Sequence, residues 1–144
     1  MLVKQILKAK GDQSVATVPP GTPVSEAARI LSEKRIGALV VSADGERPEG
    51  IISERDIVRE LGRSGDACLR TTVDKIMTAN IVTCSPEEKA DAILARMTEG
   101  RFRHLPVVEG DRMIGLISIG DVVKARLDEL AMEKEALEGM IMGH

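Results

Sequence analysis

The chain of 144 residues contains an internal duplication. The segment GIISERD at positions 50–56 returns as GLISIGD at positions 115–121, and both segments keep the pattern Gly-x-x-Ser-x-x-Asp. Identical residues also recur upstream of this motif: Thr17, Pro20, Glu33, Arg35, Leu39 and Val41 return as Thr83, Pro86, Glu99, Arg101, Leu105 and Val107. The lead-in VKQIL at 3–7 is likewise similar to VDKIM at 73–77. Because one such repeat cannot bury its apolar face alone, the duplication predicts two copies packed against each other.

Each copy has the pattern of a strand, a helix, two strands and a second helix. In the first copy we expect the first helix to have Thr22 as its N-cap and Pro23 as its first residue, and to stop at Gly37. The corresponding helix of the second copy stops at Gly100. Apolar runs at 38–41 and 105–108 predict strands that are covered on both faces. Since a three-stranded sheet with two helices is too small to be stable alone, we predict an α/β (α+β) fold of two β-α-β-β-α repeats packed about a pseudo-twofold axis.

The duplication also predicts the domain boundaries. The first repeat, with its lead-in helix, covers residues 1–62, and the second covers residues 73–128. Residues 63–72 form a polar linker without hydrophobic periodicity. Residues 129–144 extend the last helix beyond the second repeat.

Composition limits the classes of function. The net charge of −3 argues against a nucleic-acid-binding protein, and Phe102, the single aromatic residue, cannot form a base-stacking surface. No apolar run approaches the roughly 18 residues of a membrane span, so we expect no membrane partner. Cys68 and Cys84 have no metal-type spacing and no paired partner, which favours a cytoplasmic location without disulfides or a metal site.

The duplicated motif places a hydroxyl and a carboxylate at the start of a helix. Ser53 and Ser118 stand where the helix N-terminus attracts anions and can donate to a phosphate oxygen. Asp56 and Asp121 lie one turn further on and can accept from the two hydroxyls of a ribose. The alternative is purely structural: each Ser is an N-cap and each Asp completes a capping box. Both roles are compatible.

These motifs resemble those of a known family. The segments RHLPVV at 103–108 and GLISIGD at 115–121, their counterparts in the first copy, and IMT at 76–78 resemble a tandem cystathionine-β-synthase (CBS) domain pair, or Bateman module, of the stand-alone bacterial type. The resemblance covers nearly the whole chain. It implies that AMP, ADP, ATP, NAD or S-adenosylmethionine binds in two symmetry-related clefts between the copies.

The resemblance also implies the residues that line these clefts. One cleft would be formed by Thr78, Ile81, Val82, Thr83 and Pro106, and the other by Val15, Ala16, Ile36, Gly37 and Ala38. Apolar walls and backbone groups of this kind suit adenine. Each residue has the alternative of being plain core, which is the better interpretation for Ile36 and Ile81 individually.

Basic residues differ between the two copies. Arg55 in the first motif is replaced by Gly120 in the second, and it is either a phosphate ligand or a solvated charge at the start of a helix. The resemblance implies that Arg103 and His104 face the phosphates; the alternative is that they cap the preceding helix. Since the first copy has small residues at these two positions, we expect two clefts of unequal affinity.

The C-terminal segment predicts a long helix. Val123, Leu127, Leu130, Leu137 and Ile141 form a heptad-like seam that Lys134 interrupts. Such a helix either projects and packs on a second copy, which would make a homodimer through the CBS helices and this helix, or folds back on its own domain.

The sequence therefore predicts a regulatory sensor of an adenine nucleotide, with AMP, ATP or NAD(H) as ligand and a role in signal transduction. The alternative is a CBS scaffold that binds partners and no ligand. An enzyme is not expected, because no nucleophile–base pair or metal cluster is recognisable.

Overall fold

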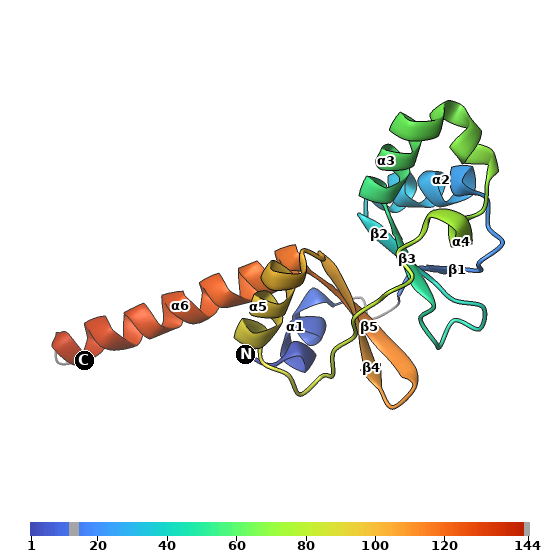
Figure 1. The fold of residues 1–144 in the computed structure, drawn as a ribbon. Helices are drawn as coiled ribbons and strands as arrows, with labels where there is room; N and C mark the ends of the chain where they lie inside the picture. Colours follow the sequence, from blue (N-terminus) through green and yellow to red (C-terminus); the bar gives the residue numbers. More distant parts are fainter. Residues whose placement is uncertain (12–14, 143–144) are drawn as a thin grey trace.

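The computed structural model of the chain describes residues 1–11 and 15–142. Its elements follow in the order α1 (Val3–Lys10), β1 (Thr17–Val18), α2 (Val24–Lys34), β2 (Ala38–Val41), β3 (Gly50–Ser53), α3 (Glu54–Ser64), the 3-10 helix η1 (Gly65–Arg70), α4 (Val73–Ile76), α5 (Ala90–Gly100), β4 (His104–Glu109), β5 (Arg112–Ser118) and α6 (Ile119–Ile141). Figure 1 shows two α/β units, one built from β1 to α3 and the other from α5 to α6. The predicted fold class is confirmed, although the last two residues of the predicted extension, 143–144, lie outside the described residues.

The two sheets differ in the first strand of the repeat. In the first sheet, β1 pairs in parallel with β2, and β2 pairs antiparallel with β3. In the second, β4 and β5 form an antiparallel pair, and the strand that corresponds to β1 is reduced to a parallel bridge between Cys84 and Val107. Pro106 gives the reason. It stands where the first copy has Val40, whose N–H donates to the Ala16 carbonyl oxygen at 3.1 Å; because proline has no N–H, the equivalent bond cannot form.

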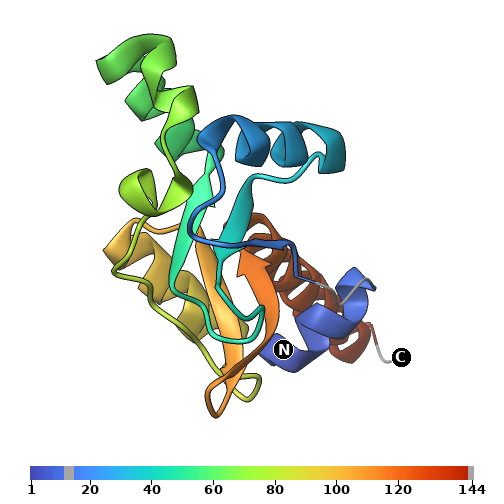
Figure 2. The same ribbon diagram turned by 90° about the vertical axis from the view of Figure 1, so that its right-hand side faces the viewer.

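Each lead-in helix packs into the opposite repeat. Val3, Ile6 and Leu7 of α1 are buried in the core of the second repeat, whereas Val73 of α4 is buried in the core of the first. The views in Figures 1 and 2 agree that α1 lies beside α6, far along the chain, and not beside α2. The two repeats are therefore joined by an exchange of segments as well as by the face between them.

The exchange explains the glycine of the duplicated motif. A Cβ atom added at Gly115 would lie 2.8 Å from Leu7 Cδ2, and one added at Gly50 would meet the thioether of Met77 even more closely. Leu7 and Met77 are equivalent residues of the two lead-ins. The glycine is thus required for close approach of the exchanged segment to the strand.

Helix boundaries differ from the prediction at both ends of α2. The helix begins at Val24 with Pro23 as its N-cap, so Thr22 is not the cap. It ends at Lys34, before Gly37, because Arg35 adopts the left-handed conformation with φ of 54°. Arg101 does the same after α5, with φ of 57°. The turn that ends each helix is therefore made by an arginine, in a conformation that usually favours glycine.

The last helix leaves the body of the molecule. α6 has 23 residues, and its buried residues Val122 and Ala125 lie near its start. Further along, the exposed fractions of Leu127 and Leu137 are both 61%, and that of Ile141 is 84%. Figure 1 shows this part of α6 extending away from both repeats, so it does not fold back on its own domain. None of the helices in the described ranges has both the length and the hydropathy that a bilayer span requires.

Candidate functional site

A cavity of about 520 Å³ lies between the two repeats. Its lining combines α1, the segment leading into β1, the end of α2 with the start of β2, and the strands β4 and β5: Leu7, Lys10, Val15, Ala16, Lys34, Ile36, Gly37, Ala38, His104, Gly115, Leu116 and Ser118. This volume falls within the range of about 300–1,000 Å³ that is usual for small-molecule sites. We call it the Ser118 cleft.

The Ser118 cleft brings together residues that the sequence predicts to act together. The whole predicted set Val15, Ala16, Ile36, Gly37 and Ala38 lines it, together with His104 and Ser118. The sequence interpretation missed Lys10 and Lys34, and also Leu7, Gly115 and Leu116. Leu7 could have been found from the duplicated lead-in at 3–7, which indicates that α1 belongs to the repeat. Lys10 and Lys34 carry no such signal.

Ser118 and Asp121 form a capping box at the start of α6. The Asp121 N–H donates to Ser118 Oγ at 3.1 Å, and the Ser118 N–H donates to Asp121 Oδ2 at 2.9 Å. Lys10 Nζ lies 2.9 Å from the same Oδ2. Burial acts to raise the pKa of Asp121, but the hydrogen bond from the Ser118 N–H and the Lys10 ammonium outweigh it and hold the pKa below its usual value. Asp121 is therefore a carboxylate beside the cleft.

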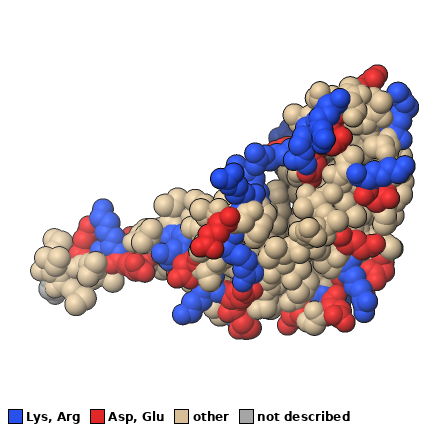
Figure 3. Space-filling model, in the orientation of Figure 1, with Lys and Arg blue, Asp and Glu red and all other residues tan. Residues whose placement is uncertain are grey.

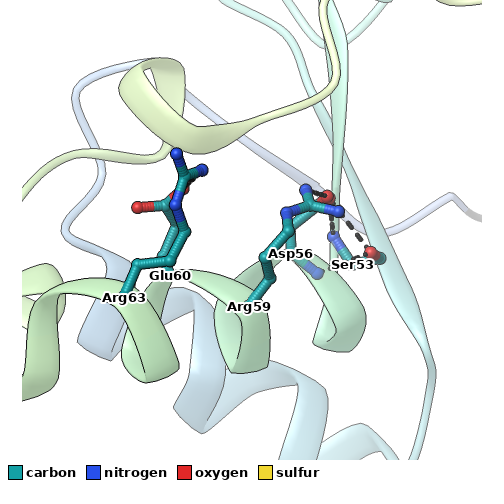
Figure 4. A network of polar contacts seen from close by, with 5 residues as sticks. All are labelled: Ser53, Asp56, Arg59, Glu60 and Arg63. Carbon is teal, nitrogen blue, oxygen red and sulfur yellow. Dashed lines mark hydrogen bonds and ion pairs between the residues drawn. The ribbon is translucent and has the colours of Figure 1, made fainter.

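Ser53 and Asp56 form the same capping box in a more closed environment. The Asp56 carboxylate accepts from the Ser53 N–H at 2.9 Å and from Ser53 Oγ at 3.0 Å, while Arg59 donates to its other oxygen at 2.6 Å. Figure 4 shows the Arg59 side chain lying over the Asp56 carboxylate. Asp56 is 4% exposed. The two motifs are thus alike in their caps, but both oxygens of Asp56 have partners and a ligand has little access to them.

His104 lies across the Ser118 cleft from Gly37. It pairs with Ser118 in the β4–β5 ladder, and a Cβ added at Gly37 would lie 3.7 Å from His104 Nε2. A Cβ at this position would therefore be in ordinary van der Waals contact with the imidazole of the other copy. Burial lowers the pKa of His104, with the Asp121 carboxylate acting against this shift. The imidazole is neutral at neutral pH.

The lowered pKa of His104 predicts a pH-dependent stability. The unfolded chain takes up a proton near pH 6.5 and the folded chain only at lower pH, so the free energy of unfolding falls as pH decreases through about 6.5. We expect His104→Asn to flatten this decrease in urea denaturation measured at several pH values. His144→Asn, which changes the other histidine of the chain, is the control; an unchanged slope in His104→Asn would contradict the assignment.

Arg55 and Arg103 are exposed, and neither lines the Ser118 cleft. Arg103 accepts a bond from the Ile119 N–H through its carbonyl oxygen, at 2.8 Å. Within the described ranges, neither guanidinium is paired with a carboxylate. Figure 3 shows Lys and Arg side chains gathered at the edge of the hollow between the two repeats.

The other predicted set, Thr78, Ile81, Val82, Thr83 and Pro106, does not line the Ser118 cleft. Thr78 exchanges backbone hydrogen bonds with Ile51, at 2.8 and 3.0 Å. Thr83 accepts from Arg96 through its carbonyl oxygen, and Pro106 is buried within β4. Ile81 is half-buried and Val82 is 37% exposed. Among residues 1–11 and 15–142, no three His, Cys, Asp or Glu side chains form a group that could hold a metal ion.

The fold and the duplicated site motif agree with a comparison against known families. The sequence model of the CBS domain matches residues 3–63 and again residues 73–128. The chain belongs to the CBS domain family. This CBS pair is 36% identical to the mitochondrial CBS domain-containing protein CBSX3 of Arabidopsis thaliana, over 98% of the chain and 72% of that relative. The predicted cytoplasmic location stays a prediction, since the name of this relative places it in mitochondria.

Solved structures show the same architecture. A CBS-domain containing protein from Agrobacterium tumefaciens is 44% identical, with a TM-score of 0.83 over 88% of this chain and 99% of that one. A CBS domain protein from Pyrobaculum aerophilum, solved as a complex with AMP, is 26% identical with a TM-score of 0.78, over 92% and 99% of the two chains. The CBS pair of protein MJ0100, solved with 5′-methylthioadenosine and S-adenosylmethionine, is also 26% identical, with a TM-score of 0.78 over 90% and 98%. Longer Arabidopsis relatives are matched over much less of their length, 22% in the case of CBSCBSPB3.

Proposed function

We propose that this CBS pair is a regulatory module that binds an adenine nucleotide in the Ser118 cleft, with AMP, ATP or NAD(H) as the ligand and no catalytic step. The observation that carries the proposal is the cavity of about 520 Å³ beside Ser118 and the Asp121 carboxylate. A carboxylate is suited to accept from ribose hydroxyls, and apolar residues such as Ala16 and Ile36 suit the adenine ring. The complexes of related CBS pairs with AMP and with other adenosine compounds support this ligand class.

The structure favours the Ser118 cleft over its symmetry-related counterpart. The ribose role of Asp56 requires Arg59 to move away from a carboxylate whose side chain is 6% exposed. We therefore propose that the symmetry-related cleft, which would contain Arg55 and the residues from Thr78 to Thr83, binds the ligand more weakly than the Ser118 cleft. Binding in either cleft bridges the two repeats, so the ligand would act by changing how they pack.

Thermal denaturation with a panel of ligands tests this function. AMP, ATP, NAD or NADH at about 100 times its dissociation constant should stabilise the fold by about 2.7 kcal/mol, which raises the melting temperature by roughly 5–10 °C. Asp121→Ala should weaken the binding of the active ligand at least about tenfold, because charge-assisted hydrogen bonds to the ribose are lost. Asp128→Ala, an exposed carboxylate on the same helix, is the matched control.

The panel also separates the proposal from its alternative. A melting temperature that does not change with any of these ligands at millimolar concentration would overturn nucleotide binding. It would leave the CBS pair as a scaffold that binds other proteins.

We propose further that a second copy of the chain covers the exposed seam of α6. Leu127, Leu130, Leu137 and Ile141 are between 48% and 84% exposed and follow a heptad-like spacing. A seam with this spacing is self-complementary, since the same residues of two copies interlock around a twofold axis. The result is a homodimer in which α6 supplies part of the interface.

The dimer is tested with two neighbouring substitutions on α6. Leu137→Glu places a charge in the seam and should convert the dimer to a monomer, which halves the mass measured by light scattering after size exclusion. Ala136→Glu introduces the same charge one residue away, off the seam, and should leave the dimer intact. A wild-type chain of monomeric mass, or equal masses for the two variants, would contradict this interface.

A further inference from the structure

A lysine holds the carboxylate on which the proposed nucleotide site depends. Lys10 Nζ lies 2.9 Å from Asp121 Oδ2 and donates to the Leu116 carbonyl oxygen at 3.0 Å. Lys10 is the last residue of α1, and it also lines the Ser118 cleft. Lys10 therefore contacts Asp121 and also borders the space in which the ligand would be bound. A ribose that approaches Asp121 Oδ2 has to compete with Lys10 for this oxygen.

The charged lining of the cleft is cationic. Lys10 and Lys34 are the charged residues among those that line it, while His104 is neutral at neutral pH. The nearest carboxylates stand beside the lining: Asp121 is paired with Lys10, and Glu54 Oε1 is 3.8 Å from the position of a Cβ added at Gly37. Among the residues that the structure describes, none forms an ion pair with Lys34. The cleft thus offers two ammonium groups, one of which is already engaged.

We propose that Lys10 determines the class of ligand that the Ser118 cleft accepts, by exchanging Asp121 for a ligand phosphate when a nucleotide binds. A phosphorylated adenosine gives Lys10 a new anionic partner and leaves Asp121 to the ribose. Adenosine and 5′-methylthioadenosine bring no anionic group, so they have to displace Lys10 without compensation. This inference rests on the proposed function and names its ligand class as AMP-type nucleotides.

The exchange is feasible because the ion pair is partly exposed. The side chains of Lys10 and Asp121 are 37% and 21% exposed, and pairs in such surroundings are weak, so displacing Lys10 lowers affinity by no more than about fivefold. A lysine ammonium on its flexible stem can turn from one acceptor to another. Its contact with a phosphate is charge-assisted, which raises affinity by about tenfold or more.

Calorimetric titration of wild type and Lys10→Met with adenosine and AMP tests the exchange, because the two ligands should respond in opposite directions. Lys10→Met should bind AMP about tenfold more weakly, since a phosphate partner is lost. It should bind adenosine about two- to fivefold more tightly, since Asp121 is released. Lys10→Arg should restore the preference for AMP. Wild type should bind 5′-methylthioadenosine more weakly than AMP.

Lys8→Met is the matched control, because it removes an exposed charge from the same helix outside the cleft. It should keep the wild-type ratio of the two affinities. If Lys10→Met weakens both ligands by the same factor, Lys10 is a structural residue and the inference is overturned. An unchanged ratio in Lys10→Met, or equal binding of adenosine and AMP by wild type, also overturns it while the proposed function stands. Wild type that binds neither ligand overturns the proposed function together with this inference.

Discussion

Deleting residues 1–11 is expected to destroy the cooperative folding of the second repeat. The deletion removes Val3, Ile6 and Leu7, which are all at most 6% exposed and belong to the core of that repeat. Burying a large aliphatic side chain contributes about 1.5–3 kcal/mol, so these three together contribute roughly 5–9 kcal/mol. Whole domains are stable by only about 5–15 kcal/mol. The shortened chain should therefore show no sharp unfolding transition for the second repeat in urea, and it should aggregate.

A deletion of similar length at the other end is the control for this result. Removing residues 133–144 takes away a part of α6 whose described residues are mostly exposed. The monomer fold should survive this second deletion with nearly the same free energy of unfolding. A shortened chain without residues 1–11 that still unfolded cooperatively, as a single unit, would show that the exchange of lead-in helices is dispensable.

Asp56→Ala is expected to destabilise the chain by about 2–3 kcal/mol, although the residue lies in a proposed ligand site. Its side chain is 6% exposed, and its carboxylate accepts from Ser53 and Arg59. The substitution leaves the Ser53 N–H without a partner, and a lost hydrogen bond to a charged group costs about 1.5–3 kcal/mol. The melting temperature should decrease by roughly 5–10 °C.

The equivalent substitution Asp121→Ala should cost only about 1 kcal/mol, close to the typical value of a helix cap. Its carboxylate is more exposed than that of Asp56, and its ion pair with Lys10 is weak for the same reason. Urea denaturation of the two variants gives the comparison directly. Equal losses of unfolding free energy in the two variants would mean that the two motifs are energetically alike. This result would contradict the description of Asp56 as the more buried carboxylate.

The duplication predicted the fold because it relates residues that lie far apart in the chain. The residue pattern of a single helix or strand cannot do this. Once Ser53 and Ser118 are known to be equivalent, the capping boxes and the packing of two copies follow from local chemistry. Comparison of the two copies also accounts for the shortened strand at Cys84. Pro106 replaces Val40 in the alignment of the copies, and this replacement removes one N–H donor from the strand ladder. The end of α2 was not predictable in this way, because left-handed Arg35 occupies a position where glycine is the usual signal, whereas α5 ends at Gly100 as predicted.

The candidate site was predictable to the extent that it follows the repeat. Ala16, Gly37 and His104 were placed in it through their positions in the two copies, and the structure brings them together. Lys10 has no counterpart in the motif, and its contact with Asp121 spans most of the chain. Such a contact depends on the path of α1 across the second repeat, which side-chain types alone do not specify. For the same reason the sequence did not distinguish the closed carboxylate of Asp56 from the more open one of Asp121.

Because α6 is one uninterrupted helix, a movement at the cleft is carried along its whole length. The helix has Ser118, on the wall of the cleft, as its N-cap and runs for 23 residues from Ile119 to Ile141. At 1.5 Å per residue it is a rod of about 34 Å, so a tilt of about 5° at its base moves its tip by about 3 Å. A displacement of this size is comparable with the diameter of a methyl group and is enough to shift one row of interlocked side chains against another. A small tilt of the helix at Ser118 would therefore produce a large displacement at its C-terminal end.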